Sequence, residues 1–422
     1  MYRVKDNVLF NLILFLFYKV SLDVVYYFFI SNIFSYEGYY ADFDLVRLIF
    51  SYILVVFSYI TLPKSVNKLS SIIIWMLNLI SFIPMTTYYA FTYVNTQFMF
   101  AVAFFWIFIN LALGKSPNIT FEIRIKSEES NKIFIFLCLI LSLYVIVMLY
   151  INFGIKINFD LIKVYDIRSQ YNQVKFPFSG YFVNWLAYII YPILFSIFIV
   201  KKKIVKALFV VLLQLYLFFV SGMKAFLFAP AFVLCLMWIV TRKNPFAYII
   251  LGLIGAIMIG ILSYNFFNNV LVLSLFCRRT LFVPARLYFI YYDYFTEHDI
   301  ILLSHSIFKG IFNYPYDLNP VNLIGYVYFD RATMSANTGI VGDAYMNFGY
   351  AGLVFWGILL IIILKIVDCC AKGLDKRISM AAMAMPVIAL TNSALLTSLL
   401  THGILLSIFI LYLLPRDNHL TD

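Results

Sequence analysis

Apolar runs long enough to cross a bilayer recur along nearly the whole chain. A transmembrane helix needs about 20 consecutive, mostly apolar residues. The 422 residues are 64% hydrophobic and only 12% charged, with a mean hydropathy of +0.93, which leaves too little polar surface for a soluble domain. We therefore expect an all-α polytopic membrane protein that forms a single integral membrane domain over residues 1–422.

The apolar runs predict about twelve transmembrane helices. They are expected at 8–34, 43–62, 69–91, 97–113, 133–153, 180–200, 204–220, 225–240, 247–267, 350–367, 379–397 and 402–414.

The distribution of charge predicts which connections face the cytoplasm, because lysine and arginine accumulate in short cytoplasmic loops. With both termini inside, the cytoplasmic connections hold the excess of basic residues and account for the formal charge of +11. Nucleic-acid binding is therefore not needed to explain that charge. Two outer segments are too long to be turns, the loops 154–179 and 268–349. The chain contains no phosphate-binding G-x-x-x-x-G-K-[ST] motif, which argues against ATP-driven transport.

Basic residues on the outer side need another explanation. The candidates among them are Arg168, Lys224, Arg278, Arg279 and Arg286. Lys224 follows a Ser-Gly-Met break that predicts a tight turn. Arg279 and Arg286 are seven residues apart and share a helix face, while Arg278 points aside. Guanidinium forks suit phosphate oxygens, so these side chains are candidates for a pyrophosphate clamp; alternatively, each only reaches lipid headgroups.

Two residues are candidates for a catalytic base. Asp343 precedes an apolar run, and His402 lies at the predicted outer turn between the last two spans. A carboxylate or an imidazole at a partly dry boundary can accept the proton of a sugar hydroxyl. The alternatives are that Asp343 caps the helix that follows it and that His402 is a satisfied interfacial histidine.

The remaining polar and aromatic signals are weaker. Asn337, Tyr292 and Tyr345 are candidates for glycan contacts, since amides bond hydroxyls and aromatic faces stack on sugars. The scattered histidines and cysteines lack ligand spacing, so no metal site and no cofactor is expected. Lys19 and Asp23, four residues apart in the first span, are expected to form a structural ion pair.

Four segments resemble the recurring segments of bacterial O-antigen and capsule repeat-unit polymerases. They are Ser-Gly-Met-Lys at 221–224, the arginine-rich segment 278–286, Tyr-Asp-Tyr-Phe at 292–295, and Ala-Asn-Thr-Gly-Ile-Val-Gly-Asp-Ala-Tyr-Met-Asn-Phe-Gly at 336–349. Their order along the chain and the large outer loop before the final spans are also similar to that family.

The resemblance implies a membrane glycosyltransferase of the C-type class that works at the outer face of the bacterial cytoplasmic membrane without metal or cofactor. Its substrates would be oligosaccharides linked to undecaprenyl pyrophosphate, and its partners membrane lipid, a flippase and a chain-length regulator. Arg279, Arg286 and Lys224 would neutralise the pyrophosphate. Asp343 or His402 would accept the proton or hold the sugar.

Two other functions fit the same composition. An O-antigen ligase would share the donor and transfer it to a lipid A core. A flippase or exporter of lipid-linked oligosaccharide would need cationic residues lining its spans and, usually, internal repeats. Here the cations cluster on outer loops, so we rank polymerase first, ligase second and transporter third.

Overall fold

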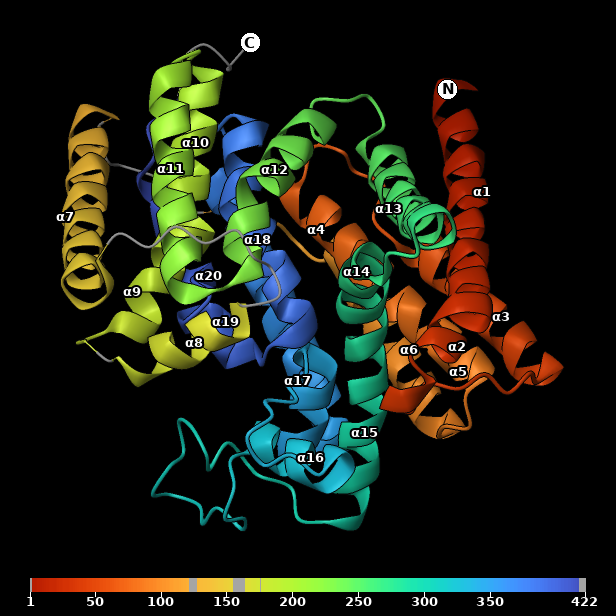
Figure 1. Ribbon diagram of the computed structural model, residues 1–422. Coiled ribbons are helices and arrows are strands. Elements are labelled where there is room, and N and C mark those ends of the chain that lie inside the picture. The colour runs from red at the N-terminus through yellow and green to blue at the C-terminus, as the bar shows by residue number, and fades with distance from the viewer. Residues whose placement is uncertain (1, 121–126, 155–163, 175, 417–422) are drawn as a thin grey trace. The chain divides into compact units, whose positions relative to one another are not determined.

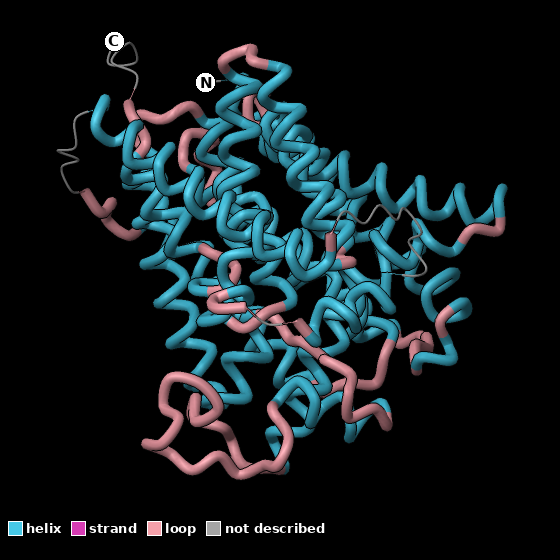
Figure 2. The backbone as a smooth tube through the Cα atoms, turned by 60° about the vertical axis from the view of Figure 1, so that its left-hand side comes forward, coloured by secondary structure: helices cyan, strands magenta, loops and turns pink. Residues whose placement is uncertain are grey.

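The computed structural model describes residues 2–120, 127–154, 164–174 and 176–416. Within these ranges the regular elements are all helices, and the one β feature is an isolated bridge between Lys309 and Phe312. Figures 1 and 2 show helices joined by short connections, with one longer loop between Glu297 and Pro320. The expectation of an all-α protein is confirmed for the described residues.

Nine helical segments among the described residues are long and apolar enough to cross a membrane. They are Asn7–Ile33, Leu69–Phe91, Thr96–Lys115, Lys132–Phe153, Ser179–Val200, Ile204–Ser221, Pro245–Phe267, Ile340–Ala371 and Leu395–Leu413. Two shorter apolar helices, Leu45–Thr61 and Lys224–Ile239, coincide with two more of the expected spans. The protein is thus a multi-pass membrane protein with about nine candidate spans, where about twelve were expected.

The chain divides into two compact units. Unit one comprises Met1–Pro117, Asn244–Leu364 and Leu390–Leu395; unit two comprises Asn118–Lys243, Lys365–Ala389 and Leu396–Asp422.

Unit one contains the N-terminal helices and, after the first segment of unit two, the helices from α13 to most of α17. Its elements are α1 (Tyr2–Val25), the π-helix η1 (Tyr26–Ile30), α2 (Ser31–Ile33), the 3-10 helix η2 (Ser35–Glu37), α3 (Leu45–Thr61), α4 (Leu69–Leu77), the π-helix η3 (Asn78–Phe82), α5 (Ile83–Phe91), α6 (Thr96–Lys115), α13 (Pro245–Phe267), α14 (Val270–Leu273), the π-helix η5 (Ser274–Phe282), α15 (Val283–Glu297), α16 (Pro320–Phe329) and most of α17 (Ile340–Ala371).

Unit two holds the middle helices and most of the C-terminal ones. They are α7 (Ser127–Phe153), α8 (Val164–Gln173), α9 (Ser179–Trp185), the π-helix η4 (Leu186–Ile190), α10 (Tyr191–Val200), α11 (Ile204–Ser221), α12 (Lys224–Ile239), most of α18 (Lys376–Asn392), most of α19 (Leu395–Leu400) and α20 (Ile404–Leu413).

The segment expected as the large loop 268–349 is mostly helical. Asn269 caps the N-terminus of α14 by accepting from the Leu271 amide at 2.8 Å, and the helix then runs through η5 and α15 to Glu297. α15 is aromatic and buried on all sides over residues 287–292, which its moderate overall hydropathy hides. The shorter expected loop, 154–179, contains α8; residues 155–163 and 175 of it lie outside the described residues.

Three of the four π-helices in the described chain stand directly before a helix with proline at its second position. η3, η4 and η5 precede Pro84, Pro192 and Pro284 respectively. In a π-helix the amide of a residue donates to the carbonyl five positions earlier. Proline has no N–H, so each such proline leaves one carbonyl without its helical donor.

Buried side chains of neighbouring helices donate to the carbonyls that prolines leave free. The Tyr18 hydroxyl donates to the Leu79 carbonyl, five residues before Pro84, at 3.0 Å. The side-chain amide of Gln214 donates to two such carbonyls, that of Ala187 at 3.1 Å and that of Phe226 at 3.2 Å. Ala187 precedes Pro192 by five residues in π geometry, and Phe226 precedes Pro230 by four in α12.

The same arrangement occurs once more near the C-terminus. The Ser407 hydroxyl donates to the Ala382 carbonyl at 2.6 Å, and Ala382 lies four residues before Pro386 in α18. Four proline-freed carbonyls therefore receive a side-chain hydrogen bond within their own unit. Inside a bilayer no water could replace these donors.

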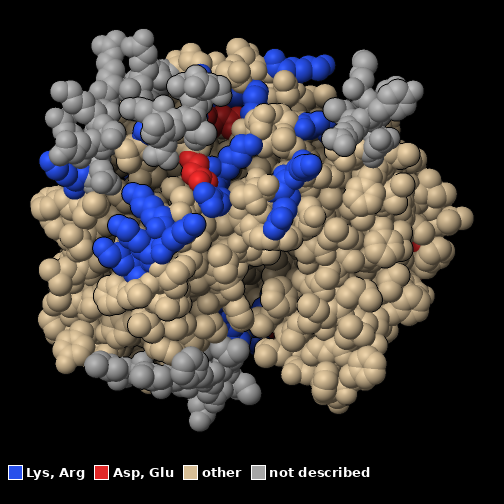
Figure 3. All heavy atoms as spheres, turned by 90° about the horizontal axis from the view of Figure 1, so that it is seen from above, with Lys and Arg blue, Asp and Glu red and all other residues tan. Residues whose placement is uncertain are grey.

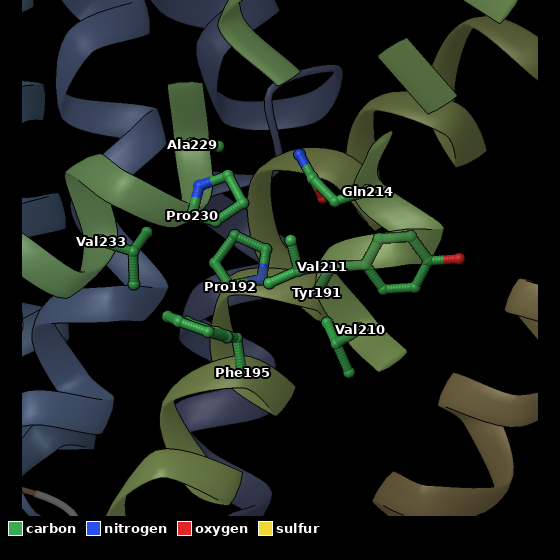
Figure 4. Close-up of a pocket in the computed structure, with 9 residues that line it drawn as sticks. All are labelled: Tyr191, Pro192, Phe195, Val210, Val211, Gln214, Ala229, Pro230 and Val233. Atoms are coloured by element: carbon green, nitrogen blue, oxygen red, sulfur yellow. The ribbon is translucent and has the colours of Figure 1, made fainter. Parts of the chain in front are cut away.

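Gln214 also lines a small apolar cavity of unit two, shown in Figure 4 between Pro192 and Pro230. Its volume, including the part open to solvent, is about 210 Å³. Drug-sized ligands occupy pockets of roughly 300 to 1,000 Å³, so this cavity is too small for an oligosaccharide. It is a packing defect at two proline kinks.

The predicted ion pair in the first span is confirmed. Lys19 and Asp23 form a salt bridge with side chains that are 0% and 10% exposed. Thr87 donates to Asp23 at 2.8 Å and accepts from Lys19 at 3.2 Å, while the Tyr52 hydroxyl donates to Asp23 at 2.8 Å. A buried pair needs such additional hydrogen bonds to offset its desolvation. The pair joins α1 to α3 and α5.

Replacing Gln214 by leucine should destabilise the protein, because two buried carbonyls would lose their donors at about 1 to 3 kcal/mol each. The measurement is the thermal unfolding midpoint in detergent. The double variant Gln214→Leu/Pro230→Ala should recover part of the loss, since an alanine amide at 230 can donate to the Phe226 carbonyl. Equal midpoints for wild type and Gln214→Leu would contradict this role.

Candidate functional site

Two arginines of unit one converge on the connection between α2 and α3. Arg278 forms a salt bridge with the Glu37 carboxylate and donates to the Ser274 hydroxyl at 2.9 Å. Arg286 donates to the backbone carbonyl of Glu37. We call Arg278 and Arg286 the arginine pair. The pair brings two positive charges to Glu37, one at its carboxylate and one at its backbone carbonyl.

Aromatic rings enclose both guanidinium groups. The Arg278 group lies 4.5 Å from the centre of the Phe34 ring, and the Arg286 group lies 5.1 Å from that of Tyr39 and 5.4 Å from that of Phe329. Such contacts hold a guanidinium by cation–π attraction. Burial raises the pKa of the Tyr39 phenol, and the nearby Arg286 and Arg278 charges act against that rise. Tyr39 therefore stays a neutral wall of the site.

The π-helix η5 decides which arginines meet. The sequence predicts that Arg279 and Arg286 share a face, yet it is Arg278 and Arg286 that contact Glu37. The wide turns of η5 shift the helical register by about one residue, so positions eight apart lie together as positions seven apart would in an α-helix. Arg279 is exposed instead. This prediction is corrected by a feature that α-helical periodicity cannot show.

Gly38 permits the approach of Arg286. Its φ is +82°, and a Cβ placed there would lie 2.8 Å from Nη2 of Arg286. An L side chain at this position would both strain the backbone and push against the guanidinium. The connection 34–44 is therefore shaped to receive an arginine.

In unit two, the Lys224 turn has the predicted form and is contacted by Arg168. Gly222 ends α11 with a φ of 64°, and Lys224 is the first residue of α12. Arg168, on α8, directs Nη2 to the Gly222 carbonyl at 3.4 Å, a long contact. Two of the expected clamp residues thus belong to adjoining segments of one unit, next to the N-terminus of a helix, where backbone amides favour anions.

Two aromatic contacts, both made by Tyr188, connect His402 to the start of α12. Its ring centre is 5.3 Å from that of Tyr188, which in turn is 5.5 Å from that of Phe226 in the first turns of α12. Tyr188 is also within electrostatic reach of Arg168. His402 was expected at a turn between two spans; it occupies the break between α19 and α20, inside the candidate span Leu395–Leu413.

Asp343 is buried and fully engaged. It is 2% exposed, and its Oδ2 accepts from Trp356 Nε1 at 2.7 Å and from the Leu395 amide at 2.8 Å. Its Oδ1 accepts from Asn347 Nδ2 at 3.0 Å. Asp343 does cap a helix, but the capped helix is α19, which begins at Leu395. The prediction that it caps the helix that follows it in sequence is wrong.

Asn347 extends this network to the loop before α16. Its Oδ1 accepts from the Leu303 amide at 2.9 Å, while the Leu302 amide donates to the Asn347 carbonyl at 3.2 Å. The glycine-rich stretch that contains both residues turns sharply at Gly349, whose φ is +56°. Asp343 and Asn347 thereby tie three segments of unit one together.

The aromatic candidates Tyr292 and Tyr345 meet in one cluster. Their ring centres are 4.9 Å apart, and Tyr292 also stacks on Phe98 at 4.3 Å. Both are largely buried, whereas Tyr350, whose hydroxyl donates to that of Tyr292 at 3.3 Å, is 45% exposed. Tyr350 is the ring of this cluster that a sugar could reach. Asn337 is exposed in the segment before α17.

The candidate residues are divided between the two units. Asp343, the three arginines 278, 279 and 286, and the aromatic cluster belong to unit one; Arg168, Lys224 and His402 belong to unit two. Among the described residues no three His, Cys, Asp or Glu side chains gather as metal ligands would. In the view of Figure 3, lysine and arginine side chains gather over part of the surface, and acidic side chains are few.

Sequence reasoning missed Glu37, Trp356 and Asn347. Glu37 lies in a short connection, and nothing near it in sequence indicates an arginine partner 241 positions away. Trp356 lies within an apolar run, where an indole is expected to face lipid. Asn347 had a signal, because it lies one helical turn after Asp343.

The chain matches no protein-family model, no curated protein and no solved structure. A function for this chain is therefore inferred from the geometry of these residues.

Replacing Asp343 by asparagine should lower the thermal unfolding midpoint in detergent. One oxygen cannot replace two, and the new amide group would face Asn347, so at least one buried donor loses its acceptor at about 1 to 3 kcal/mol. Asp42→Asn, at an exposed carboxylate of the same unit, is the control. An unchanged midpoint with lost activity would instead favour Asp343 as a base.

Proposed function

We propose that the protein polymerises a bacterial surface polysaccharide, O-antigen or capsule, at the outer face of the cytoplasmic membrane. It would transfer the growing glycan from undecaprenyl pyrophosphate to the non-reducing end of the next lipid-linked repeat unit. The observation that carries the proposal is the arginine pair: two guanidinium groups held together on the predicted outer side, where the positive-inside rule gives no reason for them.

The chemistry requires a site that stabilises a leaving pyrophosphate. The acceptor hydroxyl oxygen attacks the anomeric carbon, the bond from that carbon to the pyrophosphate oxygen breaks, and the lipid pyrophosphate leaves with the electron pair. Guanidinium groups fixed in advance stabilise this developing charge. In the proposal the arginine pair serves this purpose, with Arg279 exposed beside it.

The basic turn of unit two would hold a second phosphate group. Arg168, Lys224 and the N-terminus of α12 adjoin one another there, and a polymerase has two lipid-linked substrates. Asp343 and His402 remain the two candidates for proton acceptance, and three donors already engage the oxygens of Asp343. The aromatic cluster around Tyr350 would contact the glycan.

The helical layout also bears on the flippase alternative. A transporter of anionic lipid would need cations along its spans. The charged pair inside the first span, Lys19 with Asp23, is internally neutral and buried by Thr87 and Tyr52. This pair therefore offers no net positive charge to an anionic lipid.

Deleting the gene should remove the polysaccharide ladder and leave single lipid-attached repeat units, as judged by gel electrophoresis. Long chains retained on undecaprenyl pyrophosphate would indicate a ligase instead, and repeat units trapped inside the cell a flippase.

In complemented cells, Arg286→Ala and Arg278→Ala should abolish the ladder, because each removes one guanidinium from the site. Immunoblots of the membrane fraction must show that the variants still insert. Arg331→Ala, at an exposed arginine of the same unit, should keep the full ladder. Full chain length in both arginine-pair variants would overturn the role of the pair.

A further inference from the structure

We infer that Glu37 is an internal counter-anion of the arginine pair, which an incoming pyrophosphate group displaces. This rests on the proposed function for the identity of the ligand. The structural basis is the salt bridge from Glu37 to Arg278 together with the contact from Arg286 to the Glu37 carbonyl. Glu37 would thereby set the affinity and selectivity of the site.

Glu37 is more exposed to solvent than Arg278, as displacement of Glu37 by another anion requires. The Arg278 side chain is 9% exposed, whereas that of Glu37 is 35% exposed. The guanidinium is fixed by Ser274 and by the Phe34 ring, independently of the carboxylate. The carboxylate therefore reaches the arginines from the solvent side and is the partner that can leave.

The backbone that carries Glu37 lies outside the long helices, and it is held by Arg286 at the Glu37 carbonyl and by Tyr26 at the Tyr40 carbonyl. Glu37 ends the single 3-10 turn η2, whose bonds run from the Glu37 amide to the Phe34 carbonyl and from the Gly38 amide to the Ser35 carbonyl. Residues 38–44 form no helix before α3 begins. The positive φ of Gly38 places a flexible residue directly after the carboxylate. A movement of the Glu37 side chain alone breaks no helix and leaves the buried rings of Phe34 and Tyr39 in place.

The charges favour a multivalent anion over the carboxylate. Glu37 directs one oxygen, Oε2, to one guanidinium nitrogen of Arg278. A pyrophosphate offers several oxygens and at least two negative charges, so it can engage both members of the pair. With the carboxylate in place, a singly charged headgroup gains less from the site than a pyrophosphate does, because it must compete with an equal charge.

The test is to measure pyrophosphate binding by calorimetry to the full chain in nanodiscs of zwitterionic lipid, for wild type, Glu37→Gln, Asp42→Asn and Arg286→Ala. Glutamine keeps the size of Glu37 and an oxygen for Arg278 but has no charge. Asp42→Asn removes the same charge from the same connection, at an exposed side chain. Inorganic pyrophosphate and undecaprenyl pyrophosphate are the two probes.

Glu37→Gln should bind at least one probe roughly threefold more tightly than wild type, the scale expected for removing a partly exposed ion-pair partner. Asp42→Asn should leave the affinity unchanged, and Arg286→Ala should weaken it. Tightening with the lipid-linked probe alone identifies the lipid substrate as the source of the anion, and tightening with the inorganic probe alone identifies free pyrophosphate. Equal or weaker binding by Glu37→Gln, equal tightening by Asp42→Asn, or no binding by any variant overturns the inference.

The two hypotheses fail in different ways. If deletion of the gene abolishes the ladder but Glu37→Gln binds no more tightly, polymerisation stands and the exchange is wrong. If Glu37→Gln binds more tightly and Arg286→Ala more weakly while deletion leaves the ladder intact, the anion site stands and polymerisation is wrong.

Discussion

The satisfaction of backbone carbonyls inside the membrane is the constraint on which the other features of the fold depend. Each proline within a helix removes an amide donor, and the bilayer offers no water to replace it. Tyr18, Gln214 and Ser407 supply the missing donors from neighbouring helices. Because these side chains are buried, each hydrogen bond also fixes the distance between two helices. The prolines thus produce kinks and, through their freed carbonyls, specify which helices pack together.

The same combination of π-helix and proline determines the geometry of the candidate site. η5 precedes Pro284 as η3 precedes Pro84, but η5 carries the arginines. Its wide turns move Arg278 onto the face that Arg286 occupies, so that both reach the connection carrying Glu37. π-Bulges are frequent at functional sites, where they re-aim side chains. A regular α-helix over the same residues would have turned Arg278 away from Glu37.

Much of the helical layout could be predicted from the sequence, because apolar length decides it: every expected span overlaps a helix of the described chain. The number of membrane crossings could not be fixed, because helices such as Leu45–Thr61 fall at the limit of length and composition. The helix 270–297 was expected as a loop, since arginines and other polar residues interrupt its buried aromatic sequence. Within the site, residue types were predictable but pairings were not. Arg278 depends on a π-helix, and the role of Asp343 depends on Trp356 and on the Leu395 amide, which lies 52 positions away.

The ionic contacts of unit one separate into two kinds by exposure and by the number of supporting bonds. Asp23 is nearly buried and accepts from Thr87 and Tyr52 in addition to Lys19, so its removal would leave an uncompensated charge in the helix bundle. Glu37 is more than three times as exposed at its side chain, 35% against 10%, and its carboxylate contacts one arginine. The Arg278 guanidinium is already removed from water in the folded protein. Its contacts with the Phe34 ring and the Ser274 hydroxyl do not depend on the Glu37 carboxylate. The Lys19–Asp23 pair is therefore a permanent structural contact. In the Arg278–Glu37 pair the carboxylate can be replaced by an anion that binds the arginine more strongly.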